Sequence, residues 1–207
     1  MDEAYRVPAQ RATARIVEKK SEFIAALSPA ESEEAALAFL SEVRAAHRTA
    51  AHNVYAYQLL AGARTRYSDD GEPAKTAGLP VLGVLTHAPL TNCIIVVTRY
   101  FGGTLLGTGG LVRAYTAAAT AAVQAADILT IQRCRRLTLT LAYPQYEAAR
   151  RLLEQAGAHI DEPLFGAEVQ LGALLPAEAA EATIAPLHEL LRGEAGIALG
   201  EVHYAPF

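Results

Sequence analysis

The chain has 207 residues, a length that suits one large domain or two small ones. With 52% hydrophobic residues and a formal net charge of -4, it can build a folded core but lacks the overall positive charge that draws proteins to nucleic acid or membranes. Residues 135–207 hold five of the 18 basic and ten of the 22 acidic residues, which leaves residues 1–134 at +1. Any nucleic-acid contact is therefore expected from a local patch in the first part of the chain.

Neither the first residues nor the cysteines indicate an exported protein. The chain starts with a polar, acidic segment unlike a signal peptide, and no apolar run approaches the roughly 20 residues that span a bilayer. The cysteines, Cys93 and Cys134, form no CxxC pattern, and Cys93 opens an apolar run typical of a buried thiol. We therefore expect a cytoplasmic, soluble protein that makes no membrane contact.

In chain order, the first part alternates strand and helix patterns. The helix predicted over 33–47 has acidic residues in its first turn and basic residues near its end, and the helix dipole is sufficient reason for them. Alanine-rich residues 111–126 predict a helix that packs closely on a sheet. The other predicted elements are strands 11–19, 22–27, 54–60, 64–67 and 93–97, a polar loop 68–78 and a short helix 79–85.

From residue 135 the alternation starts again. The predicted elements are a strand 135–143, a helix 144–157, strands 158–166 and 167–175, a helix 177–191 and a last strand 197–204. This β-α-β-β-α-β order is the ferredoxin-like pattern. Residues 127–133 close the first domain or connect the two. The sequence thus predicts an α+β protein with domains at 1–132 and 133–207.

The stretch from Asn92 to Tyr115 joins an apolar strand to a helix through a glycine-rich loop. Such a transition is a common way to build an anion site. The P-loop motif fails because Thr108-Gly109 stands where Lys-Ser/Thr is required, and the dinucleotide motif fails at Val112. The alternative is that the glycines only allow close packing. They are Gly102, Gly103, Gly107, Gly109 and Gly110.

Basic residues flank these loops, and arginine forks suit phosphate oxygens. We therefore predict that this region contacts an anion or nucleic acid, and the alternative interpretation is that it serves packing. The candidate contact residues are Arg64, Arg66, Lys75, Arg99 and Arg113, together with the five glycines.

The polar loop carries carboxylates that could hold Mg²⁺: Asp69, Asp70 and Glu72. We favour the alternative that the two aspartates accept hydrogen bonds from backbone amides and fix the turn. Zinc spacing is absent, and no nucleophile elbow frames Ser68 for a triad with His52. No metal or cofactor is expected. The remaining loop residues of interest are Gly71, Pro73, Thr76 and Gly78.

Three segments, HNVYAYQL, SDDGEPAKTAGLPVL and NCIIVVTRYFGGTLLGTGGLVRAY, together resemble the YigZ/IMPACT family. Residues 14–126 resemble its defining domain, and residues 135–207 resemble the second domain of its bacterial members. One departure is that Ala74-Lys75 replaces the usual Ser-Gly, which adds a positive charge.

The resemblance implies a first domain like the second domain of ribosomal protein S5, with helices on one side of a mixed sheet. It implies a second domain like the last domain of elongation factor G. Both relatives touch RNA or the ribosome, and eukaryotic IMPACT regulates translation. We therefore expect a non-enzymatic protein that associates with RNA, the ribosome or a protein partner in translation, without DNA sequence specificity. The alternative is a phosphate- or nucleotide-binding enzyme distantly like GHMP-class kinases, whose glycine-serine motif is not found here.

Overall fold

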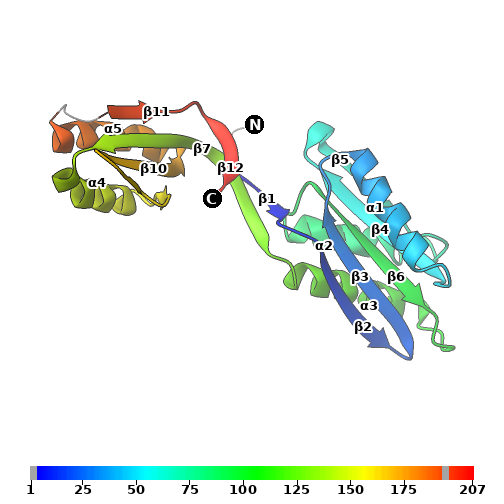
Figure 1. Cartoon of the computed structure of the whole chain (residues 1–207). Coiled ribbons are helices and arrows are strands. Elements are labelled where there is room, and N and C mark those ends of the chain that lie inside the picture. Colours follow the sequence, from blue (N-terminus) through cyan, green and yellow to red (C-terminus); the bar gives the residue numbers. More distant parts are fainter. Residues whose placement is uncertain (1–3, 193–195) are drawn as a thin grey trace. The chain divides into compact units, whose positions relative to one another are not determined.

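The computed structural model describes residues 4–192 and 196–207. The chain divides into an N-terminal unit, Tyr5–Leu129, and a C-terminal unit formed by Thr130–Phe207 with Ala4 (Figure 1). Both units combine a β-sheet with helices, so the predicted two-domain α+β class is confirmed. The predicted boundary at 132/133 falls inside β7 (Ile128–Leu141), one strand where two segments were expected.

The sheet of the N-terminal unit has the strand order β2-β3-β6-β4-β5, and neighbouring strands run antiparallel. Its central strand β6 is buried from Cys93 to Arg99, because both faces of the sheet are covered. Cys93 is fully buried, as predicted, and burial raises the pKa of its thiol to about 12. The strands are β2 (Ala12–Glu18), β3 (Ser21–Pro29), β4 (His52–Leu59), β5 (Arg64–Ser68) and β6 (Cys93–Tyr100), and a short β1 (Tyr5–Pro8) bridges Leu90 through Arg6.

Helices cover both faces of this sheet (Figure 1). On one face, α1 (Glu33–Ala46) packs its apolar residues against Tyr57, Ile94 and Val96. On the other, α2 (Gly78–His87) and α3 (Gly107–Gln124) pack against residues that include Phe23, Ile95 and Val97. The expectation of helices on one side of a mixed sheet is therefore wrong. Successive side chains of β6 point to opposite faces of the sheet, and those on both faces are apolar. Each face is therefore stable only when other elements pack over it.

Local sequence explains where these helices begin. The Ser32 hydroxyl accepts a hydrogen bond from the Ala35 N–H and caps α1. The alanines of α3 present a smooth face that contacts β2 and β3 closely.

At one end of the unit, three turns and loops lie together: the β2–β3 turn (Lys19–Lys20), the polar loop 69–77 and the glycine loop 101–106. We call this set the loop end.

The C-terminal unit is ferredoxin-like, with the strand order β11-β7-β10-β8. Two predicted strands are each interrupted, since 158–166 becomes β8 and β9, and 197–204 becomes β11 and β12. The elements α4 (Tyr143–Gln155), β10 (Val169–Pro176) and α5 (Ala177–Leu191) follow the prediction closely. The interrupted strands are β8 (His159–Ile160), β9 (Leu164–Phe165), β11 (Gly196–Leu199) and β12 (His203–Pro206).

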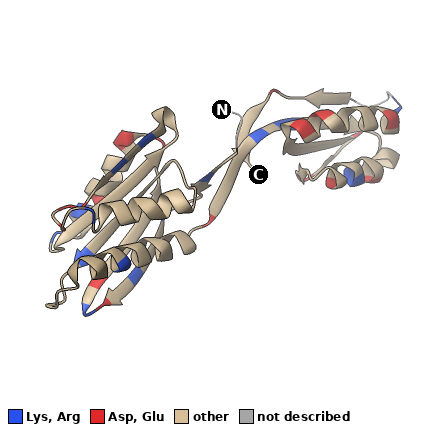
Figure 2. Ribbon diagram, turned by 180° about the vertical axis from the view of Figure 1, so that it is seen from behind, with Lys and Arg blue, Asp and Glu red and all other residues tan. Residues whose placement is uncertain are grey.

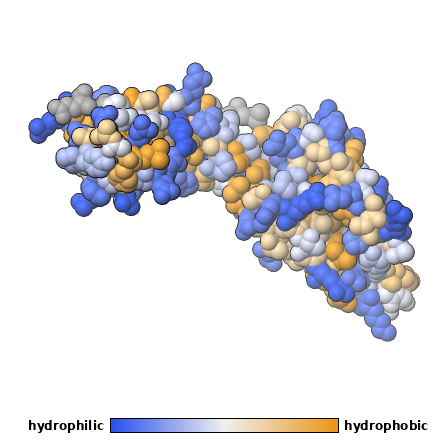
Figure 3. All heavy atoms as spheres, viewed as in Figure 1, coloured by the Kyte–Doolittle hydropathy of each residue, from blue (hydrophilic) through white to orange (hydrophobic). Residues whose placement is uncertain are grey.

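Hydrophobic residues reach the surface at separate places on the face shown in Figure 3. In the N-terminal unit the most exposed large ones are Leu105 and Val17, and in the C-terminal unit Leu164 and Phe165. Within residues 4–192 and 196–207, none of the helices has the length and hydropathy that crossing a membrane requires.

Candidate functional site

A buried ion pair lies at the centre of the loop end. The Arg99 guanidinium contacts the Glu72 carboxylate at 2.6 Å, and their side chains are only 7% and 4% exposed. Tyr115 of α3 donates its hydroxyl hydrogen to the same Glu72 oxygen at 2.7 Å. A buried charge is tolerated when it is paired and hydrogen-bonded in this way. The three side chains therefore tie the polar loop, β6 and α3 together.

The Arg99 guanidinium also lies near two aromatic rings. Its guanidinium carbon lies 5.5 Å from the ring centre of Phe23 and 5.6 Å from that of Phe101. The Arg99 Nε is buried and has no hydrogen-bond partner among the described residues. The aromatic rings beside the guanidinium offer it a cation–π contact instead. Arg99 was a predicted contact for an external anion, but the structure places it inside the fold. Burial and the Glu72 hydrogen bond also raise the pKa of Tyr115 well above its ordinary range.

Both aspartates of the polar loop accept backbone hydrogen bonds, but only Asp69 accepts them within its own loop, as the turn interpretation predicts. Asp69 accepts from the N–H groups of Lys75, Ala77 and Gly78, at 2.8, 3.0 and 2.8 Å, at the start of α2. Asp70 accepts from the Asn53 N–H at 2.6 Å and pairs with the guanidinium of α1 residue 44. These bonds hold the loop against β4 and α2.

The carboxylates of the alternative magnesium site, Asp69, Asp70 and Glu72, are each engaged in contacts within the protein. Each carboxylate faces a different partner, and among the described residues no group of three or more His, Cys, Asp or Glu side chains is placed to hold a metal ion. His52 lies nearby, with Nδ1 2.7 Å from the Asp70 carbonyl oxygen and Nε2 3.8 Å from Glu72. The Ser68 hydroxyl accepts from the Asp70 N–H, which is a turn bond and not a catalytic contact.

Packing requires the first glycine of the glycine loop. A Cβ on Gly102 would lie 2.0 Å from the Lys20 carbonyl carbon, and its N–H donates to the Ser21 hydroxyl at 3.1 Å. Gly103 follows with a φ of +81°, a conformation that favours glycine. Of the other predicted loop glycines, Gly107, Gly109 and Gly110 lie in the first turn of α3.

Two of the predicted basic residues are engaged elsewhere. Arg64 and Arg66 of β5 pair with Glu33 at 2.9 and 2.8 Å, and Tyr57 donates to that carboxylate at 2.6 Å. The hydrogen bond from Tyr57 is the main cause that lowers the pKa of Glu33. The Glu33 carboxylate thus joins α1 to β4 and β5. The helix dipole, which was the reason given for an acidic residue at this position, does not predict that role. These arginines therefore belong to the α1 face, apart from the glycine loop.

Lys75 and Arg113 remain available at the surface. Lys75 lines a hollow of about 690 Å³ between α2 and α3, together with Val112. The Arg113 guanidinium lies 3.5 Å from the position of a Cβ on Gly109, so it reaches back over the first turn of α3. Both side chains are exposed, and neither has an ion-pair partner within the part of the chain that the structure describes.

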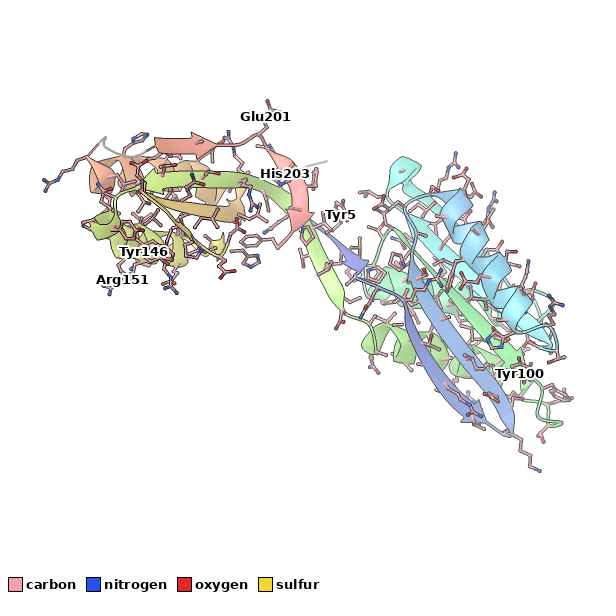
Figure 4. All side chains as sticks on the ribbon, in the orientation of Figure 1. Tyr5, Tyr100, Tyr146, Arg151, Glu201 and His203 are labelled. Carbon is pink, nitrogen blue, oxygen red and sulfur yellow. The ribbon has the colours of Figure 1, made fainter. Side chains whose placement is uncertain are left out.

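Lys19 and Lys20 were not among the predicted contact residues, although the sequence places them between two predicted strands. They form the two-residue turn between β2 and β3. Both are exposed and both have positive φ, +45° and +68°. Two lysines at turn positions between two strand patterns are the signal that could have found them. Figure 2 shows that Lys and Arg lie on several elements of the N-terminal unit, and Figure 4 shows Tyr100 where β6 ends, just before the glycine loop.

Comparisons with known proteins find relatives of both units of the chain. A family model described as the Impact N-terminal domain matches residues 19–123, and one described as a domain of unknown function (DUF1949) matches residues 139–194. The chain is 40% identical to "IMPACT family member YigZ" of Escherichia coli (strain K12) over 92% of this chain and 95% of that one. It is 31% identical to "IMPACT family member YvyE" of Bacillus subtilis (strain 168), over 91% and 88%. A solved structure described as "Crystal structure of an hypothetical protein" aligns with a TM-score of 0.62 at 35% identity, over 98% of this chain and 99% of that chain.

Proposed function

The chain belongs to the IMPACT family, and we propose that it is a non-enzymatic protein that binds RNA or ribosomal particles through the loop end of its N-terminal unit. Its likeness to eukaryotic IMPACT, a regulator of translation, directs the proposal toward the translation apparatus. The likeness is a fold and family argument, so the site must supply the chemical reason.

One observation carries the proposal. Four exposed cationic side chains, Lys19, Lys20, Lys75 and Arg113, flank the glycine loop and the start of α3, and none has an ion-pair partner among the described residues. Of the acidic residues in the polar loop, Asp70 and Glu72 are neutralised by arginines, whereas Asp69 accepts only backbone N–H groups and keeps its charge. The four cations outnumber it. Cations that are left without internal partners are available for the phosphate backbone of RNA. The surface is thus a local basic patch on a chain with a negative net charge.

A nucleotide-binding enzyme has weaker support. The glycine loop has structural reasons of its own, namely the close approach at Gly102 and the positive φ of Gly103. A thermal-shift assay with ATP, GTP and Mg²⁺ tests this alternative, because a nucleotide at 100 times its Kd stabilises by about 2.7 kcal/mol. We expect no shift, and a clear shift would support the enzyme.

The direct test compares two double variants that change the charge equally. Lys75→Gln with Arg113→Gln removes two unpaired cations, while Arg64→Gln with Arg66→Gln removes two cations that Glu33 already holds. Binding to labelled RNA and to purified ribosomal particles is measured from 50 to 300 mM salt. Each phosphate contact on a single strand contributes about 0.7 to the slope of log K against log salt, so the first pair should lower both affinity and slope.

The control pair should bind nearly as the wild-type protein does. If both pairs weaken binding equally, the contact follows net charge and not the loop end. If the wild-type chain binds neither RNA nor ribosomal particles at 50 mM salt, the proposed function is wrong.

A further inference from the structure

Beside the basic residues, the glycine loop exposes an aromatic ring. Phe101 is 53% exposed, although the β6 residues just before it are almost all buried. A large apolar ring at the surface costs hydration free energy and is typical of a contact surface. Leu105, four residues later in the same loop, is 82% exposed but has no aromatic face.

The Phe101 ring contacts the Arg99 side chain. Arg99 lies 5.6 Å from its ring centre, and Arg99 itself is fixed by Glu72 and packs over Phe23. The next residue, Gly102, is anchored by its hydrogen bond to the Ser21 hydroxyl. A ring held in this way loses little freedom when a ligand covers its open face, so it is preorganised for stacking.

Two lysines lie on the turn that contacts the segment carrying this ring. Gly102 packs on the Lys20 peptide, which places the Lys19–Lys20 turn next to the segment that carries Phe101. Of the acidic residues around the turn, Glu22 is paired with Arg15 at 2.5 Å, and Glu18 is exposed. The lysines therefore exceed the free acidic groups at this point.

From this juxtaposition we propose that the loop end binds single-stranded RNA, with one base stacked on Phe101 and the adjoining phosphates contacted by Lys19 and Lys20. This inference rests on the proposed function and names the form of RNA that the same surface takes. An aromatic ring beside a basic groove is the chemistry of single-strand binding, because unpaired bases offer a free π-face. In a duplex the bases are stacked on one another, and the deep, narrow major groove does not admit side chains.

The absence of tryptophan from the whole sequence gives the test a direct signal. Phe101→Trp introduces a unique fluorophore at the proposed stacking position, and Leu105→Trp introduces one in the same loop as the control. Titration with an unstructured adenine-rich 12-nucleotide RNA should quench the fluorescence of the Phe101→Trp variant strongly and change that of the control little. A duplex of the same length should quench neither.

Affinity provides the second measurement. Phe101→Ala should weaken binding of the single strand about fivefold to a hundredfold, as loss of one base stack does, and leave the salt slope unchanged. Leu105→Ala should bind as the wild-type protein does. Circular dichroism and thermal unfolding confirm that each variant is folded.

The outcomes separate the two proposals. If RNA binding depends on Lys75 and Arg113 but the Phe101→Ala variant binds the single strand normally, the proposed function stands and the stacking inference is overturned. Equal affinity of the wild-type chain for single strand and duplex also overturns it. If the wild-type chain binds no RNA at low salt, both proposals are wrong.

Discussion

Tyr115 donates a hydrogen bond to Glu72 at 2.7 Å, and this contact joins the middle of α3 to the polar loop. Because the same carboxylate neutralises buried Arg99, the free energy of unfolding should depend strongly on it. Glu72→Gln leaves an uncompensated buried charge and should destabilise the N-terminal unit by about 3–5 kcal/mol. Urea unfolding followed by circular dichroism measures the loss.

Tyr115→Phe is the milder variant of the same contact. It removes a hydrogen bond to a charged acceptor and should cost about 1.5–3 kcal/mol. The order of the two effects is the informative result. If Glu72→Gln unfolds at the same urea concentration as the wild-type protein, the buried ion pair does not stabilise the unit.

The Tyr57–Glu33 contact predicts a change of stability at alkaline pH. Burial and the Glu33 hydrogen bond raise the pKa of Tyr57 to about 12, above the ordinary value of 10.0. The folded state therefore keeps the proton more tightly than the unfolded state. The stabilisation is complete below pH 10 and is lost as the pH rises from 10 toward 12. In thermal unfolding, Tyr57→Phe should lose less stability than the wild-type protein across that interval, and a parallel loss in both would contradict the prediction.

The secondary structure was predictable where a pattern is local and repeats. The α5 helix has the predicted bounds, Ala177–Leu191, because the apolar periodicity that defines it lies within the segment. The break between β8 and β9 was not predictable, since strands of two residues are too short to show alternation. The covering of both sheet faces was missed because the family likeness suggested one layer of helices, although the buried strand β6 carries apolar residues on both of its faces.

The polar loop and the glycine loop were singled out from the sequence, but Lys19 and Lys20 were not among the candidate contacts, and the pairing of the basic residues was not predicted. Arg99 and Glu72 are 27 positions apart, and Arg66 and Glu33 are 33 apart. Sequence spacing carries no information on which basic residue meets which carboxylate across a fold. The basic residues therefore looked like one set, although the structure pairs Arg99, Arg64 and Arg66 with carboxylates and leaves Lys75 and Arg113 without an ion-pair partner among the described residues.

Gly102 should be intolerant of a side chain. Alanine there would bring Cβ within 2.0 Å of the Lys20 carbonyl carbon, a main-chain atom that cannot rotate away. We expect Gly102→Ala to cost about 1–3 kcal/mol by displacing the β2–β3 turn. Gly109→Ala is the matched control, because its nearest neighbour is the mobile Arg113 guanidinium at 3.5 Å. That variant should be neutral or up to about 1 kcal/mol more stable. Equal urea midpoints for the two variants would contradict the packing argument.

The Lys19–Lys20 turn should show a conflict between stability and binding. Both residues have positive φ in a two-residue hairpin turn, for which Asn-Gly is the preferred sequence. Lys19→Asn with Lys20→Gly should therefore stabilise the N-terminal unit, by about 1 kcal/mol or more, since the left-handed conformation costs roughly that for other residues. Urea unfolding measures the gain.

The same double variant should bind RNA more weakly, because it removes two of the cations beside the glycine loop. Lys19→Gln with Lys20→Gln separates the two effects, since it removes the charges but keeps side chains in the strained conformation. Both variants should lose about 0.7 in salt slope for each lost phosphate contact, while only the Asn-Gly variant gains stability. Unchanged RNA affinity in both variants would mean that the two lysines occupy a strained turn for a reason other than RNA binding.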